Sequence, residues 1–104
     1  MKVLNMTSSN GNKVPNQFII ESGNKIVFQS YNTIIAIKEN GKVILDSKAL
    51  EYSATTLKYL KQFLNTNESK KSLYEKIESG FYTTSDLNWS TLNFYLNKEI
   101  YHEY

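Results

Sequence analysis

The first half of the chain contains four short runs that are rich in β-branched and aromatic residues. The runs are QFIIE, KIVFQSY, TIIAIKE and KVILD, and they follow one another between positions 17 and 46. Each is bounded by residues that favour turns, of which Asn40-Gly41 is the strongest signal, because both residues tolerate positive φ. The pattern therefore predicts a four-stranded antiparallel β-meander over residues 17–46. Residues 1–16 show no sustained period and predict at most a strand at 2–5, followed by a loop.

The second half of the chain changes to the spacing of a helix. Leu57, Leu60 and Leu64 recur at intervals of three and four residues, and Ser53 before them is of a type that caps helices. These positions predict a helix over about 54–65. We expect its leucine stripe to pack on the sheet, because a meander needs a cover on one face to be stable.

Two more helices are expected after this one. The second runs from a cap at Asn67 to position 79, with Leu73 and Ile77 one turn apart and a glycine at position 80 that suits a helix end. Residues 81–84 are predicted to be an extended linker. The third helix starts at Ser85-Asp86 and carries an apolar stripe, made of Leu92, Leu96 and Ile100.

The predicted fold class is α+β: an N-terminal four-stranded antiparallel β-meander followed by about three helices that pack on one sheet face. A chain of 104 residues has the usual size of one domain, so residues 1–104 are expected to form a single domain. Within it, the meander occupies 17–46 and the helical part 53–104, with 89–104 as an appended interaction helix.

Composition restricts the classes of function. The chain has 12 basic and 10 acidic residues and a formal net charge of +2, without the strong excess of a dedicated nucleic-acid binder. It has no cysteine, which excludes disulfides and thiolate zinc sites. Its one histidine, His102, excludes metal sites built from several histidines. No metal and no cofactor are therefore expected.

The sequence gives no sign of targeting to a membrane. No apolar run approaches the ~18 residues that a membrane-spanning helix needs. The N-terminal residues MKVLNMTSSNGNK also lack a hydrophobic stretch of signal-peptide length. We therefore expect a cytoplasmic protein that makes no contact with membranes.

Catalysis is not expected. The carboxylates are scattered, and Glu75 and Glu78 belong to a polar helix surface. Glu99, His102 and Glu103 resemble a catalytic set only in residue type, since they fall in the last turn of the chain. The four glycines stand singly, so no phosphate-binding loop is present. The sequence thus predicts a binding protein rather than an enzyme.

The C-terminal segment carries more aromatic side chains than its apolar stripe can bury. Exposed Trp and Tyr side chains concentrate binding energy at protein interfaces. Alternatively, these aromatics complete a small core or an intrachain helix pair, or form a homodimer contact. The candidate partner-binding residues are Trp89, Phe94, Tyr95, Tyr101 and Tyr104.

A second candidate surface lies on the two middle helices. Lysines there, with a tyrosine among them, suggest contacts to phosphates and stacking on bases. Because the chain has no arginine, the bidentate contact to guanine is missing. A solvated helical face is the alternative. The candidate nucleic-acid-binding residues are Lys58, Lys61, Lys70, Lys71 and Tyr59.

Several short strings stand out between residues 10 and 88. They are QFII at 17–20, FQSY at 28–31 with IIA at 34–36, GKV at 41–43 with Asp46 after it, YSATTLKY at 52–59 with FL at 63–64, and IESGFYTTSDLN at 77–88. In these strings, residues 10–88 resemble a family of short phage and mobile-element proteins of unknown function. The resemblance implies a phage-encoded protein but no known chemistry, and it leaves residues 89–104 as an extension.

Together, the resemblance and the lack of a catalytic set suggest a non-enzymatic protein that inhibits a host antiviral effector. Its most concrete form is an anti-CRISPR protein that binds a CRISPR-Cas protein stoichiometrically. The alternative is a nucleic-acid-binding accessory protein of phage gene control or replication.

Overall fold

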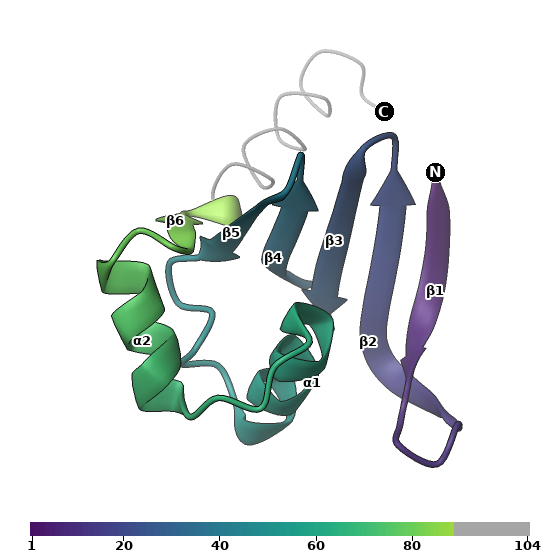
Figure 1. Ribbon diagram of the computed structural model, residues 1–104. Coiled ribbons are helices and arrows are strands. Elements are labelled where there is room, and N and C mark those ends of the chain that lie inside the picture. Colours follow the sequence, from purple (N-terminus) through teal and green to yellow (C-terminus); the bar gives the residue numbers. More distant parts are fainter. Residues whose placement is uncertain (89–104) are drawn as a thin grey trace.

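A computed structural model describes residues 1–88 of the chain, whose strands form one sheet (Figure 1). The strands lie in the sheet in the order in which they occur in the chain. Those from β1 to β5 are antiparallel to their neighbours, whereas β6 lies parallel to β5. The strands are β1 (Lys2–Thr7), β2 (Lys13–Ser22), β3 (Lys25–Ser30), β4 (Thr33–Glu39), β5 (Lys42–Asp46) and β6 (Thr83–Ser85).

The predicted α+β class and the β-meander are confirmed, because β2 to β5 cover the four apolar runs. Two further strands belong to the sheet: β1, which includes residues 2–5 where the sequence predicted at most a short strand, and β6, which was not predicted. β1 pairs with β2, which itself begins at Lys13 rather than at position 17. β6 pairs with β5 at Thr83 and Thr84, in a segment predicted to be a linker. A strand of three residues is too short to show a period, so its pairing is decided by tertiary structure.

The first helix, α1 (Ala54–Leu64), lies where its leucine spacing predicted it. Ser53 caps its start, with its Oγ accepting a hydrogen bond from the backbone N–H of Thr56 at 3.0 Å. Asn65 ends it in the left-handed region at φ 57°. Asn tolerates that conformation better than most residues, and its N–H bonds to carbonyls of the last turn.

The buried side of α1 differs in part from the expected leucine stripe. Leu60 is fully buried, but Leu57 and Leu64 are only half-buried and pack at the margin of the core. Tyr59 and Phe63 are buried instead. These two aromatic side chains are one turn apart and offer more apolar area than leucine, so the helix turns them toward the sheet.

The second helix, α2 (Lys70–Glu78), begins later than predicted. Its cap is Ser69, whose Oγ accepts a hydrogen bond from the N–H of Ser72 at 3.1 Å, so the expected cap at Asn67 is wrong. The residues before it form a turn, in which the N–H of Glu68 donates to Oγ1 of Thr66 at 3.2 Å. That bond keeps the chain out of helical conformation until position 69.

An ion pair at the start of α2 makes stability depend on pH. The Lys76 ammonium lies 2.5 Å from Glu68 Oε2, and this contact together with the Ser72 hydroxyl lowers the pKa of Glu68 from 4.5 to about 2. The ionised pair stabilises the folded state above pH 4.5, and this contribution is lost as the pH falls from 4.5 to 2. We expect Glu68→Gln to reduce the loss of stability over this range, as measured by urea unfolding at several pH values.

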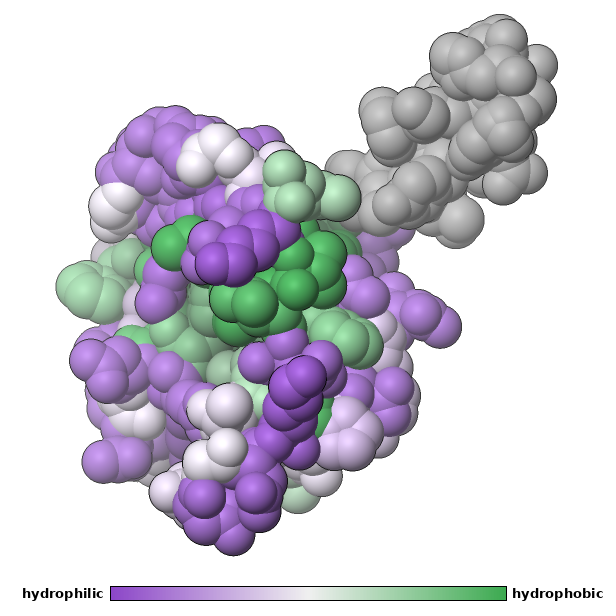
Figure 2. Space-filling view, turned by 90° about the vertical axis from the view of Figure 1, so that its right-hand side faces the viewer, coloured by the Kyte–Doolittle hydropathy of each residue, from purple (hydrophilic) through white to green (hydrophobic). Residues whose placement is uncertain are grey.

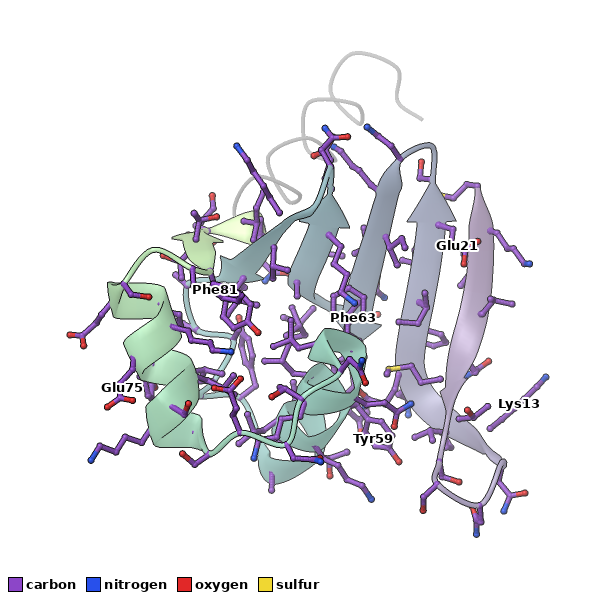
Figure 3. The ribbon with its side chains drawn as sticks, viewed as in Figure 1. Lys13, Glu21, Tyr59, Phe63, Glu75 and Phe81 are labelled. Carbon is purple, nitrogen blue, oxygen red and sulfur yellow. The ribbon has the colours of Figure 1, made fainter. Side chains whose placement is uncertain are left out.

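The control for this experiment is Glu75→Gln. Glu75 lies on α2, next to Lys76 in the chain, is exposed and points from the helix into solvent (Figure 3). Its substitution should leave the pH dependence between 4.5 and 2 as in the parent protein. An equal effect of the two substitutions would show that general charge, rather than the pair with Lys76, sets the acid response.

The core lies between one face of the sheet and the two helices (Figure 1). Phe28 of β3 is fully buried, and its ring stacks on that of Phe63 with centroids 5.8 Å apart. Figure 3 shows Phe63 between α1 and the strands. The other residues without solvent exposure are Ile35, Ala36, Leu45, Leu60, Leu73 and Gln17.

The described part of the chain ends at the start of the expected third helix. Leu87 and Asn88 are helical, directly after Ser85-Asp86, as the sequence predicted. The stripe of Leu92, Leu96 and Ile100 lies outside the described residues. Neither α1 nor α2 is long and apolar enough to cross a membrane, and no other helix among residues 1–88 is.

A candidate protein-binding face

The sheet carries apolar side chains on both faces, and only one face contributes to the core. On the other face, the apolar side chains are half-buried, except for Val3, which is 56% exposed. None of them belongs to the core cluster. This apolar sheet face consists of Val3, Phe18, Ile20, Val27, Ile34, Ile37 and Ile44.

Strand register places five of these side chains in one continuous row. Val3 is paired with Ile20, Ile20 with Val27, Val27 with Ile37, and Ile37 with Ile44. Directly paired residues point to the same face of a sheet, so the row crosses β1 to β5 with one β-branched residue from each strand. Such rows are typical of a surface that packs against another layer.

No helix that the structure describes lies over this face. The two helices α1 and α2 lie on the opposite side of the sheet (Figure 1). A polar row bounds the apolar one at the hairpin end, made of the paired Ser22, Lys25, Glu39 and Lys42. Hydrophobic side chains are also exposed toward the β1 side, where hydrophilic ones surround them (Figure 2). The apolar row is thus bounded by polar side chains at its hairpin end.

Asn88, the last described residue, is held at the backbone of Ile34 in β4. Its side-chain Oδ1 accepts a hydrogen bond from the N–H of Ile34 at 2.7 Å, and its Nδ2 donates to the carbonyl of Ile34 at 2.9 Å. The amide thereby replaces a strand partner at the point of β4 where pairing with β5 has ended. The aromatic-rich segment 89–104 therefore starts next to a residue of the apolar sheet face.

Asp46 holds the neighbouring backbone in place. Its carboxylate is 3% exposed and accepts hydrogen bonds from the N–H groups of Lys48 and Leu87, both at 3.1 Å, and from the hydroxyl of Tyr52 at 2.5 Å. Burial, together with the bond to Asp46, raises the pKa of Tyr52 to about 12. Tyr52 is therefore a neutral donor at all physiological pH values, and Asp46 ties the end of β5 to Leu87.

The structure separates the lysines of the candidate nucleic-acid surface. Lys58 and Lys61 line an open groove of about 620 Å³ on the outer side of α1, together with Gln62 and Asn65. Neither Lys70 nor Lys71 of α2 lines that groove. Lys70 lies 3.5 Å from Glu51 in an ion pair, and Lys71 is exposed.

Tyr59 was expected to be an exposed stacking residue, and this is wrong. It is 5% exposed and packs in the core, with the ammonium of Lys58 over its ring at 5.4 Å from the centroid. Its helical spacing from Thr56 and Phe63 places it on the side of α1 that faces the sheet. A base cannot stack on this ring in the folded protein.

The remaining predicted site residues lie outside the described part of the chain. They are Trp89, Phe94, Tyr95, Tyr101 and Tyr104. Within residues 1–88, no three His, Cys, Asp or Glu side chains are grouped so that they could hold a metal ion.

The sequence analysis did not predict the apolar sheet face, although the sequence contains a signal for it. Several strands have consecutive apolar residues, such as Ile19-Ile20, Val27-Phe28 and Ile34-Ile35, where a strand with one wet face would alternate. Neighbouring residues in a strand point to opposite faces, so consecutive apolar residues require both faces to be apolar. The runs predicted strands, and the same runs predict a second face that needs a cover.

Comparison with known proteins gives a family but no function. The chain matches the model of a family of unknown function (DUF8033) over residues 1–80. No curated protein and no solved structure matches the chain. The matched span includes the whole meander and both helices, and it ends before β6. The chain therefore belongs to this family of unknown function.

Proposed function

We propose that the protein acts by binding another protein, without catalysing a reaction. The observation that carries the proposal is the apolar sheet face, which no described helix covers and which has the aromatic-rich segment 89–104 attached at its margin. Interface cores are depleted of charge and enriched in aromatic side chains. The row from Val3 to Ile44 contains no charge, and the attached segment supplies the aromatics.

The apolar sheet face is a better candidate binding surface than the lysines of α1 and α2. Contiguous exposed apolar patches are uncommon on monomeric proteins and mark sites of association. The lysine surface lacks its stacking residue, because Tyr59 is buried, and Lys70 is partly neutralised by Glu51. Nucleic-acid binding is therefore the less favoured candidate.

The concrete form of the proposal is an inhibitor of a host antiviral effector in the bacterial cytoplasm, most specifically an anti-CRISPR protein. Its support comes from the sequence: a chain of 104 residues, no candidate catalytic set, and the resemblance to short phage proteins. The partner would be a CRISPR-Cas protein, bound in a fixed ratio by Trp89, Phe94, Tyr95, Tyr101 and Tyr104.

Capture of the partner tests the proposal. The immobilised full-length protein is incubated with nuclease-treated lysate of a bacterium that carries CRISPR systems, and bound proteins are identified and quantified. We expect one defence subunit in stoichiometric amount, and at least ~10-fold weaker capture by Tyr95→Ala/Tyr101→Ala, since each lost anchor costs ~1–2 kcal/mol.

The matched control is Tyr74→Ala/Phe81→Ala, which removes two exposed aromatics from the helical side of the molecule. It should capture the subunit like the parent protein. Equal losses in both variants would overturn the site. Capture that requires nucleic acid, falls steeply with salt and is lost on replacing Lys58 and Lys61 by alanine would overturn the function in favour of nucleic-acid binding.

A further inference from the structure

We propose that residues 89–104 of the chain itself cover the apolar sheet face. In this arrangement Leu92, Leu96 and Ile100 pack on the β-branched row as the third helix of the fold. The inference modifies the proposed function: a sheet face that is covered by the chain's own segment is not free for a partner, so the partner meets the outer side of that segment instead.

The point at which the segment begins supports this occupant. Asn88 is held by two hydrogen bonds to Ile34, a residue of the apolar sheet face, at 2.7 and 2.9 Å. The N–H of Leu87 is held by Asp46 at 3.1 Å. The segment is thus tethered one residue from the face, at an effective concentration that a separate partner has to exceed.

The length of the segment fits the area to be covered. A helix of the 16 residues from 89 to 104 is about 24 Å long and about 10 Å wide. Strands lie about 4.8 Å apart, so a helix of this width spans roughly three of them. The central strands β2, β3 and β4 carry the densest part of the face, namely Phe18, Ile20, Val27, Ile34 and Ile37.

The chemistry of the segment fits as well. At 100° per residue, Leu92, Leu96 and Ile100 form one apolar ridge. Trp89 lies on the same side, so docking of the ridge withdraws it from the residues that meet a partner. Lys98 lies on the opposite side, as do Phe94 and Tyr101. A docked helix therefore buries its aliphatic ridge against β-branched side chains. The two aromatics beside Lys98 remain outside, where they can bind a partner.

Disulfide trapping tests the arrangement, and the chain is well suited to it because it has no cysteine of its own. The full-length variant Val27→Cys/Leu96→Cys is oxidised at low micromolar concentration and analysed by non-reducing electrophoresis and mass spectrometry. We expect most of the protein to form a disulfide within one chain. The control Val27→Cys/Lys98→Cys should form it at least ~10-fold more slowly, because position 98 points away.

A second readout uses Trp89, the one tryptophan of the chain. Leu92→Asp/Leu96→Asp should shift its emission to longer wavelength while far-ultraviolet circular dichroism retains the sheet. Equal trapping of both cysteine pairs would overturn the proposal. Disulfides formed only between chains would also overturn it and would assign the face to a second copy. If no disulfide forms and the emission does not shift, the proposal is overturned and the face is left to another protein. Because no partner is present, these outcomes are independent of the capture experiment.

Discussion

Replacement of Asp46 by asparagine is expected to lower the free energy of unfolding by about 3 kcal/mol. The buried carboxylate accepts three hydrogen bonds, from Lys48, Tyr52 and Leu87. Asparagine keeps one acceptor oxygen and puts an NH2 group where the other was, so at least one of the three donors loses its partner and the NH2 group is buried in its place. Bonds to charged groups contribute ~1.5–3 kcal/mol each, and orphaned donors cost more than the bond itself.

Urea unfolding at pH 7 measures this effect, with Tyr52→Phe as the matched control. The control removes one donor and leaves the carboxylate with its two backbone partners, so a loss of ~1 kcal/mol is expected. Equal stability of Asp46→Asn and the parent protein would contradict the role of the carboxylate as the link between β5 and Leu87.

Replacement of Phe28 by alanine is expected to cost about 4 kcal/mol, the largest effect of any single substitution considered. Phe28 has no exposed surface and stacks on Phe63 at 5.8 Å, so its removal loses apolar burial and leaves a cavity between β3 and α1. Substitutions of this type cost ~3–5 kcal/mol, and a domain of this size has only ~5–15 kcal/mol in total.

The control for this substitution is Phe81→Ala. Phe81 is 66% exposed, although its ring contacts Tyr82 edge to face. We expect a cost below ~1 kcal/mol, because the cavity term is absent on the surface. Thermal unfolding followed by circular dichroism compares the two variants. Similar midpoints would show that the sheet and helix layers do not form the core described above.

The fold was predictable to the extent that its signals are local. The hairpins follow from turn residues such as Asn40-Gly41, and α1 follows from its spacing and from Ser53. The cap of α2 was not predictable in the same way, because Asn67, Glu68 and Ser69 are all plausible near a helix start and the choice depends on the bond between Glu68 and Thr66. β6 was not predictable from local signals, because it is defined by its pairing with β5, which is distant in the sequence.

The candidate site was predictable only in part. The aromatics of residues 89–104 are evident from composition, but the surface beside them requires knowledge of strand register. Ile20, Val27 and Ile37 become neighbours through pairings between three strands, and no sequence period relates them. The prediction that Tyr59 is available for stacking was wrong for a related reason. A helical wheel does not show which of two apolar sides of a helix meets the sheet.

The order of the strands has a consequence for the folding reaction. Each pairing from β1 to β5 joins strands that are adjacent in the chain, so every step closes a short loop at low entropic cost. The β5–β6 pairing closes the longest loop, which contains both helices. Refolding should therefore begin with the hairpins and end with the docking of β6, which brings Leu87 to Asp46. The region where the C-terminal segment emerges is then the last part to form and the first to open.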